Sequence, residues 1–141
     1  MKKMVLITTK NEVSVLDYPV GKPGDWKEEM RGFYKAISCD CVECVHPRYM
    51  YDILQNSEGL VMVVDEEGLI AGKQINLVAS IFYGTPVHGQ PIVGDVLILA
   101  EEMTFDGTVF VGLDEERAEQ IAESVKSMFI KYGYGGSDGK Q

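Results

Sequence analysis

The sequence IVGDVLILA at residues 92–100 ends in five consecutive apolar side chains. Short apolar runs of this kind, bounded by turn-forming residues, are typical of buried strands. The dipeptide Asp106-Gly107 comes next, and Thr108–Val111 after it has the composition of a returning strand. This part of the chain therefore predicts a buried strand that is followed, across a tight turn, by a second strand.

Two further hairpins are predicted from apolar segments that flank turn residues. Met4–Thr8 and Val13–Tyr18 stand on either side of a Lys-Asn-Glu turn. Leu60–Val64 and Leu69–Ala71 stand on either side of an acidic turn, in which Gly68 suits a left-handed backbone position. Both patterns favour antiparallel pairing of neighbouring segments.

Helices are predicted between and after these strands. Asn76 is a favourable N-cap and Gly84 a favourable C-terminal stop for a short helix, Leu77–Tyr83. Asp114–Lys131 shows the clearest helical pattern, with acidic residues in its first turn and one apolar stripe. The stripe consists of Ala118, Ile121, Ala122, Val125, Phe129 and Tyr132. The other helical segments are residues 25–35, with Asp25 as N-cap, and residues 47–54.

Strands that alternate with single helices predict an α+β fold. We expect one domain over residues 1–132, with a mainly antiparallel β-sheet, two to three helices packed on it and a long C-terminal helix. The length of 141 residues agrees with a domain of ordinary size. Residues 133–141 are glycine-rich and predict a flexible tail.

Charge is distributed unevenly along the chain. The formal net charge is −9, and residues 1–50 contribute +1 whereas residues 51–141 contribute −10. An acidic surface repels phosphate backbones and anionic lipid headgroups, so we expect neither direct nucleic-acid binding nor membrane binding. The acidic part either keeps the protein soluble or serves as a surface for a basic partner.

Targeting features and cysteine use both predict a cytoplasmic protein. No apolar run approaches the roughly 20 residues of a transmembrane helix, and the N-terminus turns polar too early for a secretory signal. Three cysteines without an export signal are typical of reduced, cytosolic thiols.

The three cysteines raise the question of a metal site. Cys39, Cys41 and Cys44 lie in or beside Ile37–Val45, which has a strand pattern, and with His88 they make up a set that could bind zinc. Side chains alternate along a strand, so Cys39 and Cys41 would face away from Cys44. We therefore expect buried thiols, no metal and no other cofactor.

No pattern of a familiar enzyme is present. The chain has no GxGxxG, P-loop or HExxH motif. Cys44 and His46 would share a strand face, where adjacent side chains point in parallel, and Ser80 and His88 lack a nucleophile elbow. We expect a non-enzymatic protein with no catalytic residue.

Polar and aromatic residues gather between Asn76 and Asp95 among prolines and glycines, which is the composition of a binding loop. The candidate ligand-binding residues are Asn76, Ser80, Tyr83, His88, Gln90 and Asp95. Tyr83 could stack on a nucleotide-like ligand, and Arg48 or Lys73 could bind its phosphate. Alternatively, these groups only satisfy the backbone of the loop itself.

Four segments carry a resemblance to a known family. They are CDxVExVxP at 39–47, VVDEEGL at 63–69, NxxASxxYG at 76–84 and GQPIVGDVLI at 89–98. In this order they resemble a small family of domains of uncharacterised function, carried by Gram-positive gut bacteria, their phages and mobile elements. The resemblance covers about residues 35–120 and implies no activity. It does imply a setting in which neighbouring proteins act against host defence.

Two hypotheses follow. The first is a non-enzymatic interaction protein of phage or mobile-element origin that acts against a basic host protein through its anionic surface. Its candidate partner-binding residues are Glu115, Glu116, Glu119 and Glu123. The alternative is a module that binds or sequesters a small nucleotide-like ligand through the Asn76–Asp95 loop. A homo-oligomer is compatible with either, because the chain contains seven methionines and seven tyrosines.

Overall fold

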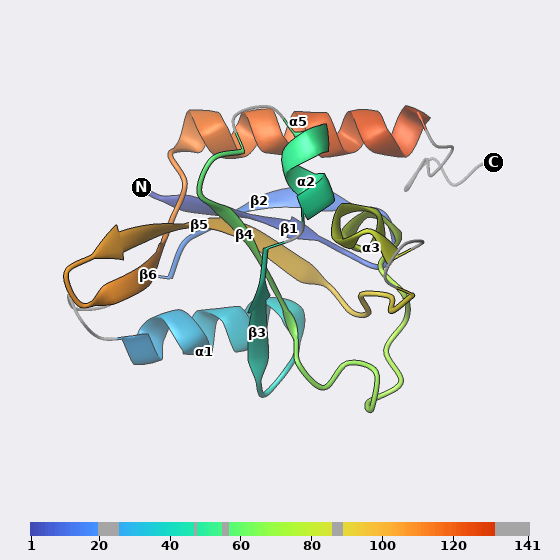
Figure 1. The fold of residues 1–141 in the computed structure, drawn as a ribbon, viewed down its shortest axis with the longest axis horizontal. Coiled ribbons are helices and arrows are strands. Elements are labelled where there is room, and N and C mark those ends of the chain that lie inside the picture. The colour runs from blue at the N-terminus through green and yellow to red at the C-terminus, as the bar shows by residue number, and fades with distance from the viewer. Residues whose placement is uncertain (20–25, 47, 55–56, 86–88, 132–141) are drawn as a thin grey trace.

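A computed structural model describes residues 1–19, 26–46, 48–54, 57–85 and 89–131 (Figure 1). These residues form an antiparallel sheet with helices on both faces, which confirms the predicted α+β class. The predictions that lie outside the described residues concern Asp25, His88, Tyr132 and the tail at 133–141.

The sheet has six strands in the order β2-β1-β5-β4-β3, and β6 pairs with β5 beyond the end of β1. The strands are β1 (Lys3–Ile7), β2 (Val13–Asp17), β3 (Val42–Val45), β4 (Leu60–Asp65), β5 (Val96–Thr104) and β6 (Gly107–Val111). The helices among the described residues are α1 (Trp26–Ile37), α2 (Arg48–Ile53), α3 (Leu77–Tyr83) and α5 (Glu115–Lys131).

The apolar runs of β4 and β5 form the centre of the sheet. All six residues of β4 and the first five of β5 are buried. Their registers pair Val61 with Leu99 and Val63 with Leu97. Such continuous burial requires cover on both faces, which explains why these strands lack a polar–apolar alternation.

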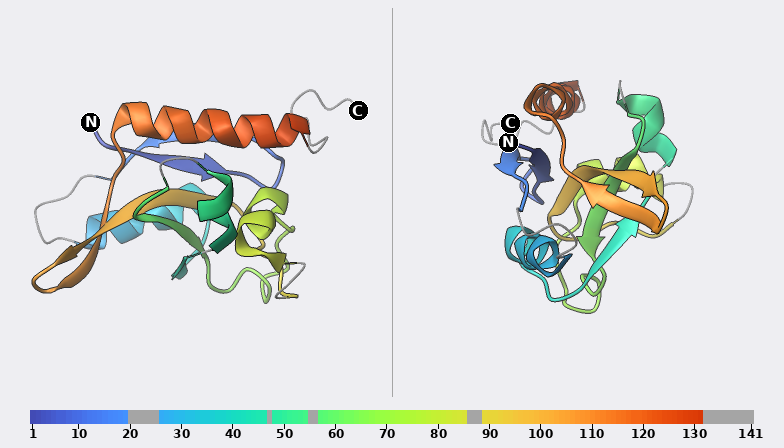
Figure 2. Two further views of the ribbon diagram at one scale, coloured as in Figure 1. Left: turned by 45° about the horizontal axis from the view of Figure 1, so that its top comes forward. Right: turned by 90° about the vertical axis from the view of Figure 1, so that its left-hand side faces the viewer.

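The two faces of the sheet carry different helices (Figures 1 and 2). Leu97 and Leu99 point to the face covered by α1, where they pack with Phe33. Val96 and Ile98 point to the opposite face, where the buried sides of α2, α3 and α5 complete the larger core. The result is a layer of one helix, a layer of sheet and a layer of three helices.

The β5–β6 hairpin projects beyond these layers, as Figure 1 and the left view of Figure 2 show. At its base, the ring of Phe110 lies 5.9 Å from that of Phe33 in an edge-to-face arrangement. At its tip, Met103 and Phe105 are almost fully exposed. The hairpin is therefore held to α1 at one end and open to solvent at the other.

Several predicted elements are confirmed. The N-terminal hairpin forms as β1 and β2, and the turn at Asp106-Gly107 joins β5 to β6. Asn76 caps α3, and Gly84 ends it with a φ of 82°. Of the α5 stripe, the buried residues are Ala118, Ile121, Ala122, Val125 and Phe129. Trp26, the first residue of α1, is 62% exposed.

The predicted hairpin between Leu60–Val64 and Leu69–Ala71 is wrong. β4 pairs with β3 on one side and β5 on the other, so no side of it remains for a third partner. Leu69–Ala71 instead lies in consecutive turns and is exposed. Gly68 does not have the predicted left-handed backbone conformation. It is needed there for space instead, since a Cβ would stand 2.6 Å from a methyl group of Val93.

Two predicted strand boundaries are also wrong. The strand expected over Ile37–Val45 begins only at Val42, because α1 continues to the buried Ile37 and Ser38 ends it with a φ of 55°. The strand expected from Ile92 begins at Val96, because Gly94 has a φ of 81°. In both cases a residue with a left-handed backbone conformation precedes the strand, and residue propensities alone predict such conformations poorly.

Candidate functional site

Asn76, the first residue of the predicted binding loop, is completely buried. Its side-chain oxygen accepts a hydrogen bond from the Ala79 amide at 3.1 Å. Its side-chain nitrogen donates to the carbonyls of Ile7 and Gly94, both at 3.0 Å. The Asn76 amide therefore joins α3 to β1 and to the chain before β5, and its polar atoms are engaged by backbone.

The other predicted loop residues are placed around the same segment. The Ser80 hydroxyl accepts from the Ile92 amide at 3.0 Å and lies 3.3 Å from the Ile92 carbonyl. Asp95 accepts from the Thr9 amide at 3.0 Å. Gln90 is exposed, Tyr83 is half-buried against the larger core, and His88 lies outside the described residues.

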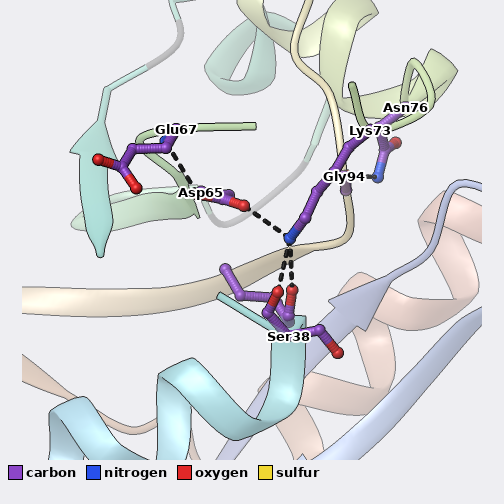
Figure 3. Close-up of polar contacts among 7 residues, drawn as sticks. Ser38, Asp65, Glu67, Lys73, Asn76 and Gly94 are labelled. Carbon is purple, nitrogen blue, oxygen red and sulfur yellow. Dashed lines mark hydrogen bonds and ion pairs between the residues drawn. The ribbon is translucent and has the colours of Figure 1, made fainter. Parts of the chain in front are cut away.

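A lysine lies beside this segment at a junction that sequence patterns did not indicate (Figure 3). The Lys73 ammonium is 2.6 Å from the Asp65 carboxylate, and it donates to the carbonyls of Ser38 at 2.7 Å and Ile37 at 3.2 Å. Asp65 also accepts from the Glu67 amide at 2.9 Å. Lys73 therefore links the end of α1 to the end of β4.

A cavity of about 170 Å³ lies at the same junction. Its lining residues are Thr9, Ile37, Ser38, Lys73, Gln74, Gly94 and Asp95. Of the two predicted phosphate-binding residues, Lys73 lines this cavity but is already paired with Asp65, and Arg48 is exposed on α2. The cavity can accept a fragment rather than a whole nucleotide, because ligand pockets usually measure ~300 Å³ or more.

The three cysteine thiols are free, and the prediction that they are buried is wrong, because each is partly exposed. Cys41 donates a hydrogen bond to the Glu66 carboxylate at 2.9 Å, which raises the pKa of the thiol to about 11. Burial and the charges of Glu101 and Glu43 raise the pKa of the Cys44 thiol to about 11 as well. These thiols are therefore protonated, and weakly nucleophilic, at neutral pH.

Cys44 has two metal-ligating neighbours. Donor atoms of Cys44, His46 and Glu101 all lie within 4.8 Å of one another. His46 Nε2 is 2.9 Å from a Glu101 carboxylate oxygen. The sequence places Cys44 and His46 on one strand face but gives no sign of Glu101, because that residue comes from another strand.

The predicted acidic residues form an exposed surface on α5. Glu115, Glu116, Glu119 and Glu123 are all exposed. Glu115, Glu119 and Glu123 recur every fourth residue, so their side chains follow one line along the helix at intervals of about 6 Å. We call these four residues the acidic face of α5.

A hollow of about 430 Å³ adjoins the start of the acidic face. It is lined by Glu58, Asp114, Glu116, Arg117 and Gln120, so three carboxylates and one guanidinium surround it. Asp114 is paired with Lys2 at 2.6 Å, which lowers the pKa of the Asp114 carboxyl. The hollow and the acidic face together form one candidate site.

Comparison with known protein families matches residues 2–126 to the domain of unknown function DUF3846. The chain belongs to this family. This match confirms the predicted resemblance to a domain family of uncharacterised function. No curated protein and no solved structure gives a significant match.

The matched range of the DUF3846 domain includes all six strands, the hollow and the acidic face. It also includes the Lys73 junction and the group formed by Cys44, His46 and Glu101. Each candidate site therefore belongs to the family domain itself rather than to an appended segment. Among the described residues, no helix has the length and apolar character needed to span a bilayer.

Proposed function

We propose that this DUF3846 domain is a non-enzymatic interaction protein that binds a basic segment of a partner protein through the acidic face of α5. The observation that carries the proposal is the hollow lined by Glu58, Asp114, Glu116, Arg117 and Gln120, which opens where the acidic face begins. Its three carboxylates outnumber the Arg117 guanidinium and the Lys2 ammonium that is paired with Asp114, so a net negative charge remains for a lysine or arginine side chain. The row of glutamates beyond it suits further basic residues of the same segment.

Acidic residues at a helix N-terminus also have a purely structural role, since they stabilise the helix dipole. That role accounts for Glu115 and Glu116 in the first turn of α5. It does not account for Glu119 and Glu123, which lie in later turns, where the dipole effect has faded. Glu123 is 3.6 Å from Lys126 in an exposed ion pair, so Glu119 carries this argument. The continuation of the acidic face favours a binding role.

The resemblance to domains of phages and mobile elements makes a host protein the expected partner. A protein that normally grips nucleic acid has the required basic surface, and the acidic face would compete with phosphates for it. Self-association into a homo-oligomer, which is compatible with this function, stays a prediction.

The test compares two triple charge reversals in the full-length protein. E115K/E119K/E123K changes the acidic face, and the control E12K/D40K/E67K changes three exposed carboxylates outside α5 by the same total charge. The probe is a fluorescent octalysine peptide, measured by anisotropy at low and high salt. We expect the first variant to bind ~10-fold or more weakly and the control to bind within ~3-fold of the unmodified protein.

Equal losses in the two variants would show attraction by overall charge alone and would overturn the proposal. Thermal melting of both variants shows whether the fold is retained. A partner captured from host lysate is then tested with the same pair of variants, and binding should weaken at high salt because exposed charges are screened.

A second function, binding of a small anionic ligand, is favoured by the cavity beside Lys73 and Asp95. Its size fits one phosphate or carboxylate group better than a nucleotide. Thermal-shift screening with phosphate, nucleoside monophosphates and dicarboxylates tests it. A ligand that raises the melting temperature of the unmodified protein, but not that of K73M, would support this function.

A further inference from the structure

We infer that Cys44, His46 and Glu101 form a binding site for a zinc ion. Their donor atoms, Cys44 Sγ, His46 Nε2 and a Glu101 carboxylate oxygen, lie within 4.8 Å of one another. The inference goes beyond the proposed protein-binding role, since it concerns residues at β3 and β5 rather than α5. It also differs from the expectation, drawn from the sequence, that the protein binds no metal.

The strand order explains why the three residues converge. β3 and β5 both pair with β4, which places them about 10 Å apart. Cys44 pairs with Val63, which in turn pairs with Leu97, so Cys44 lies on the same face as Leu97. His46 and Glu101 share this face because side chains alternate along a strand. The two long side chains then meet over β4.

The backbone positions of the donors are fixed. Cys44 lies within the β3–β4 ladder, and the Glu101 amide donates to the Gly59 carbonyl at 2.9 Å. Gly59 has no side chain to occupy the space beside Glu101, and its φ of 72° suits glycine. Tyr51, whose hydroxyl donates to the Leu60 carbonyl at 2.8 Å, lies close enough to interact with both Glu101 and Cys44.

The donor set matches the coordination chemistry of zinc. Thiolate, imidazole and carboxylate are its usual ligands, at roughly 2.3, 2.0 and 2.1 Å. Ligand atoms at those bond lengths in a tetrahedron are ~3.5 Å apart. The His46 and Glu101 donors, now 2.9 Å apart, would therefore separate slightly, and both would approach Cys44 Sγ, now within 4.8 Å, by up to ~1 Å. The His46 side chain is 54% exposed and can change rotamer to do so.

A three-residue site leaves one coordination position for water or another ligand. Glu101, the donor from β5, is the less exposed partner of the ion pair with His46, with 23% of its side chain accessible. A zinc ion there would tie β3 to β5 across β4. Binding would release the thiol proton of Cys44 to solvent, move the His46 ring proton from Nε2 to Nδ1, and replace the His46–Glu101 contact by two metal bonds.

The experiment uses the full-length protein, reduced and stripped of metal with a chelator. Co²⁺ serves as the spectroscopic probe, because a cobalt–thiolate bond gives a charge-transfer band in the near ultraviolet, and Zn²⁺ then displaces it. We expect one equivalent of Co²⁺ per chain and loss of the band in C44S. H46A and E101Q should weaken Zn²⁺ binding by ~10-fold or more.

C41S is the matched control, because Cys41 is a nearby thiol outside the proposed donor set. It should keep the band and bind Zn²⁺ within ~2-fold of the unmodified protein. Protection from alkylation gives a second readout that needs no variant: Zn²⁺ should slow the modification of Cys44 while leaving that of Cys41 unchanged. Absence of a thiolate band, its loss in C41S, or unaltered binding in E101Q would overturn the inference.

Discussion

At the scale of single residues, Asn76 makes the densest set of polar contacts, since one buried amide caps α3 and donates to two carbonyls. Asn76→Ala removes the cap and leaves the carbonyls of Ile7 and Gly94 without this donor. Losing the cap costs about 1 kcal/mol, and each unsatisfied buried group costs about 1–3 kcal/mol. We expect the free energy of unfolding to fall by about 3 kcal/mol or more in urea denaturation.

Gln74→Ala is the control for that measurement, because Gln74 is exposed two residues earlier in the chain. It should change the free energy of unfolding by no more than about 0.5 kcal/mol. A loss of less than about 1 kcal/mol in Asn76→Ala would mean that solvent replaces the buried contacts.

Cys41 offers a prediction about pH. Its thiol donates to Glu66, and ionisation would break this hydrogen bond and place two negative charges together, which is why the pKa is raised to about 11. Glu66→Gln removes the charge, so the pKa should fall and the thiolate fraction at pH 8 should rise. We expect Cys41 to react with iodoacetamide ~10-fold or more faster in this variant.

Mass spectrometry of peptides after timed alkylation resolves each cysteine. Cys44 serves as an internal control, since its raised pKa comes from burial and from Glu101 and Glu43 rather than from Glu66. Equal acceleration at Cys41 and Cys44 would indicate general loosening of the fold instead of a local change in pKa.

At the scale of elements, the Asp65–Lys73 pair joins α1 to the central sheet (Figure 3). Lys73→Met leaves the Asp65 carboxylate, whose side chain is only 5% exposed, without its cation. Removing one partner of a buried pair costs roughly 3–5 kcal/mol, and partial exposure of Lys73 reduces this to about 2–3 kcal/mol. The loss should appear as a lower midpoint in urea denaturation.

The double variant D65N/K73M tests the cause of that loss. Because it removes both charges, it should recover part of the stability lost in Lys73→Met. The result that would contradict this is additivity. If Asp65→Asn lowers the free energy of unfolding by the same amount in Lys73→Met as in the unmodified protein, the two residues act independently, and the pair does not link α1 to β4.

Elements whose ends are marked by nearby residues were predictable from sequence. Elements that depend on which strands pair with one another were not. Asn76 and Gly84 mark both ends of α3 within nine residues, so the helix was predicted with its boundaries. Leu69–Ala71 has the composition of a strand, but β4 has no open side for it to pair with. That competition depends on strand order, which the local pattern does not contain.

The candidate sites also differ in how far the sequence predicts them. The acidic face of α5 was predictable, because residues of one helix keep the spacing that the sequence gives them. The Lys73–Asp65 and His46–Glu101 pairs were not predictable, because the partners in each pair come from different elements. Only the order β5-β4-β3 brings Glu101 and His46 together.

At the scale of the whole molecule, the net charge of −9 over 141 residues predicts that salt stabilises the fold. Like charges repel more strongly in the compact state than in the unfolded chain, and salt screens this repulsion. Between 20 and 300 mM NaCl we expect the free energy of unfolding to rise by about 1 kcal/mol, measured by urea denaturation at pH 7.

The two triple charge reversals determine whether this effect belongs to the whole surface or to α5. Each changes the formal net charge from −9 to −3, so overall repulsion predicts that both reduce the salt effect by a similar amount. If only E115K/E119K/E123K reduces it, the repulsion is concentrated on the acidic face of α5. A basic partner bound there would then relieve that repulsion, and the protein would gain stability on binding.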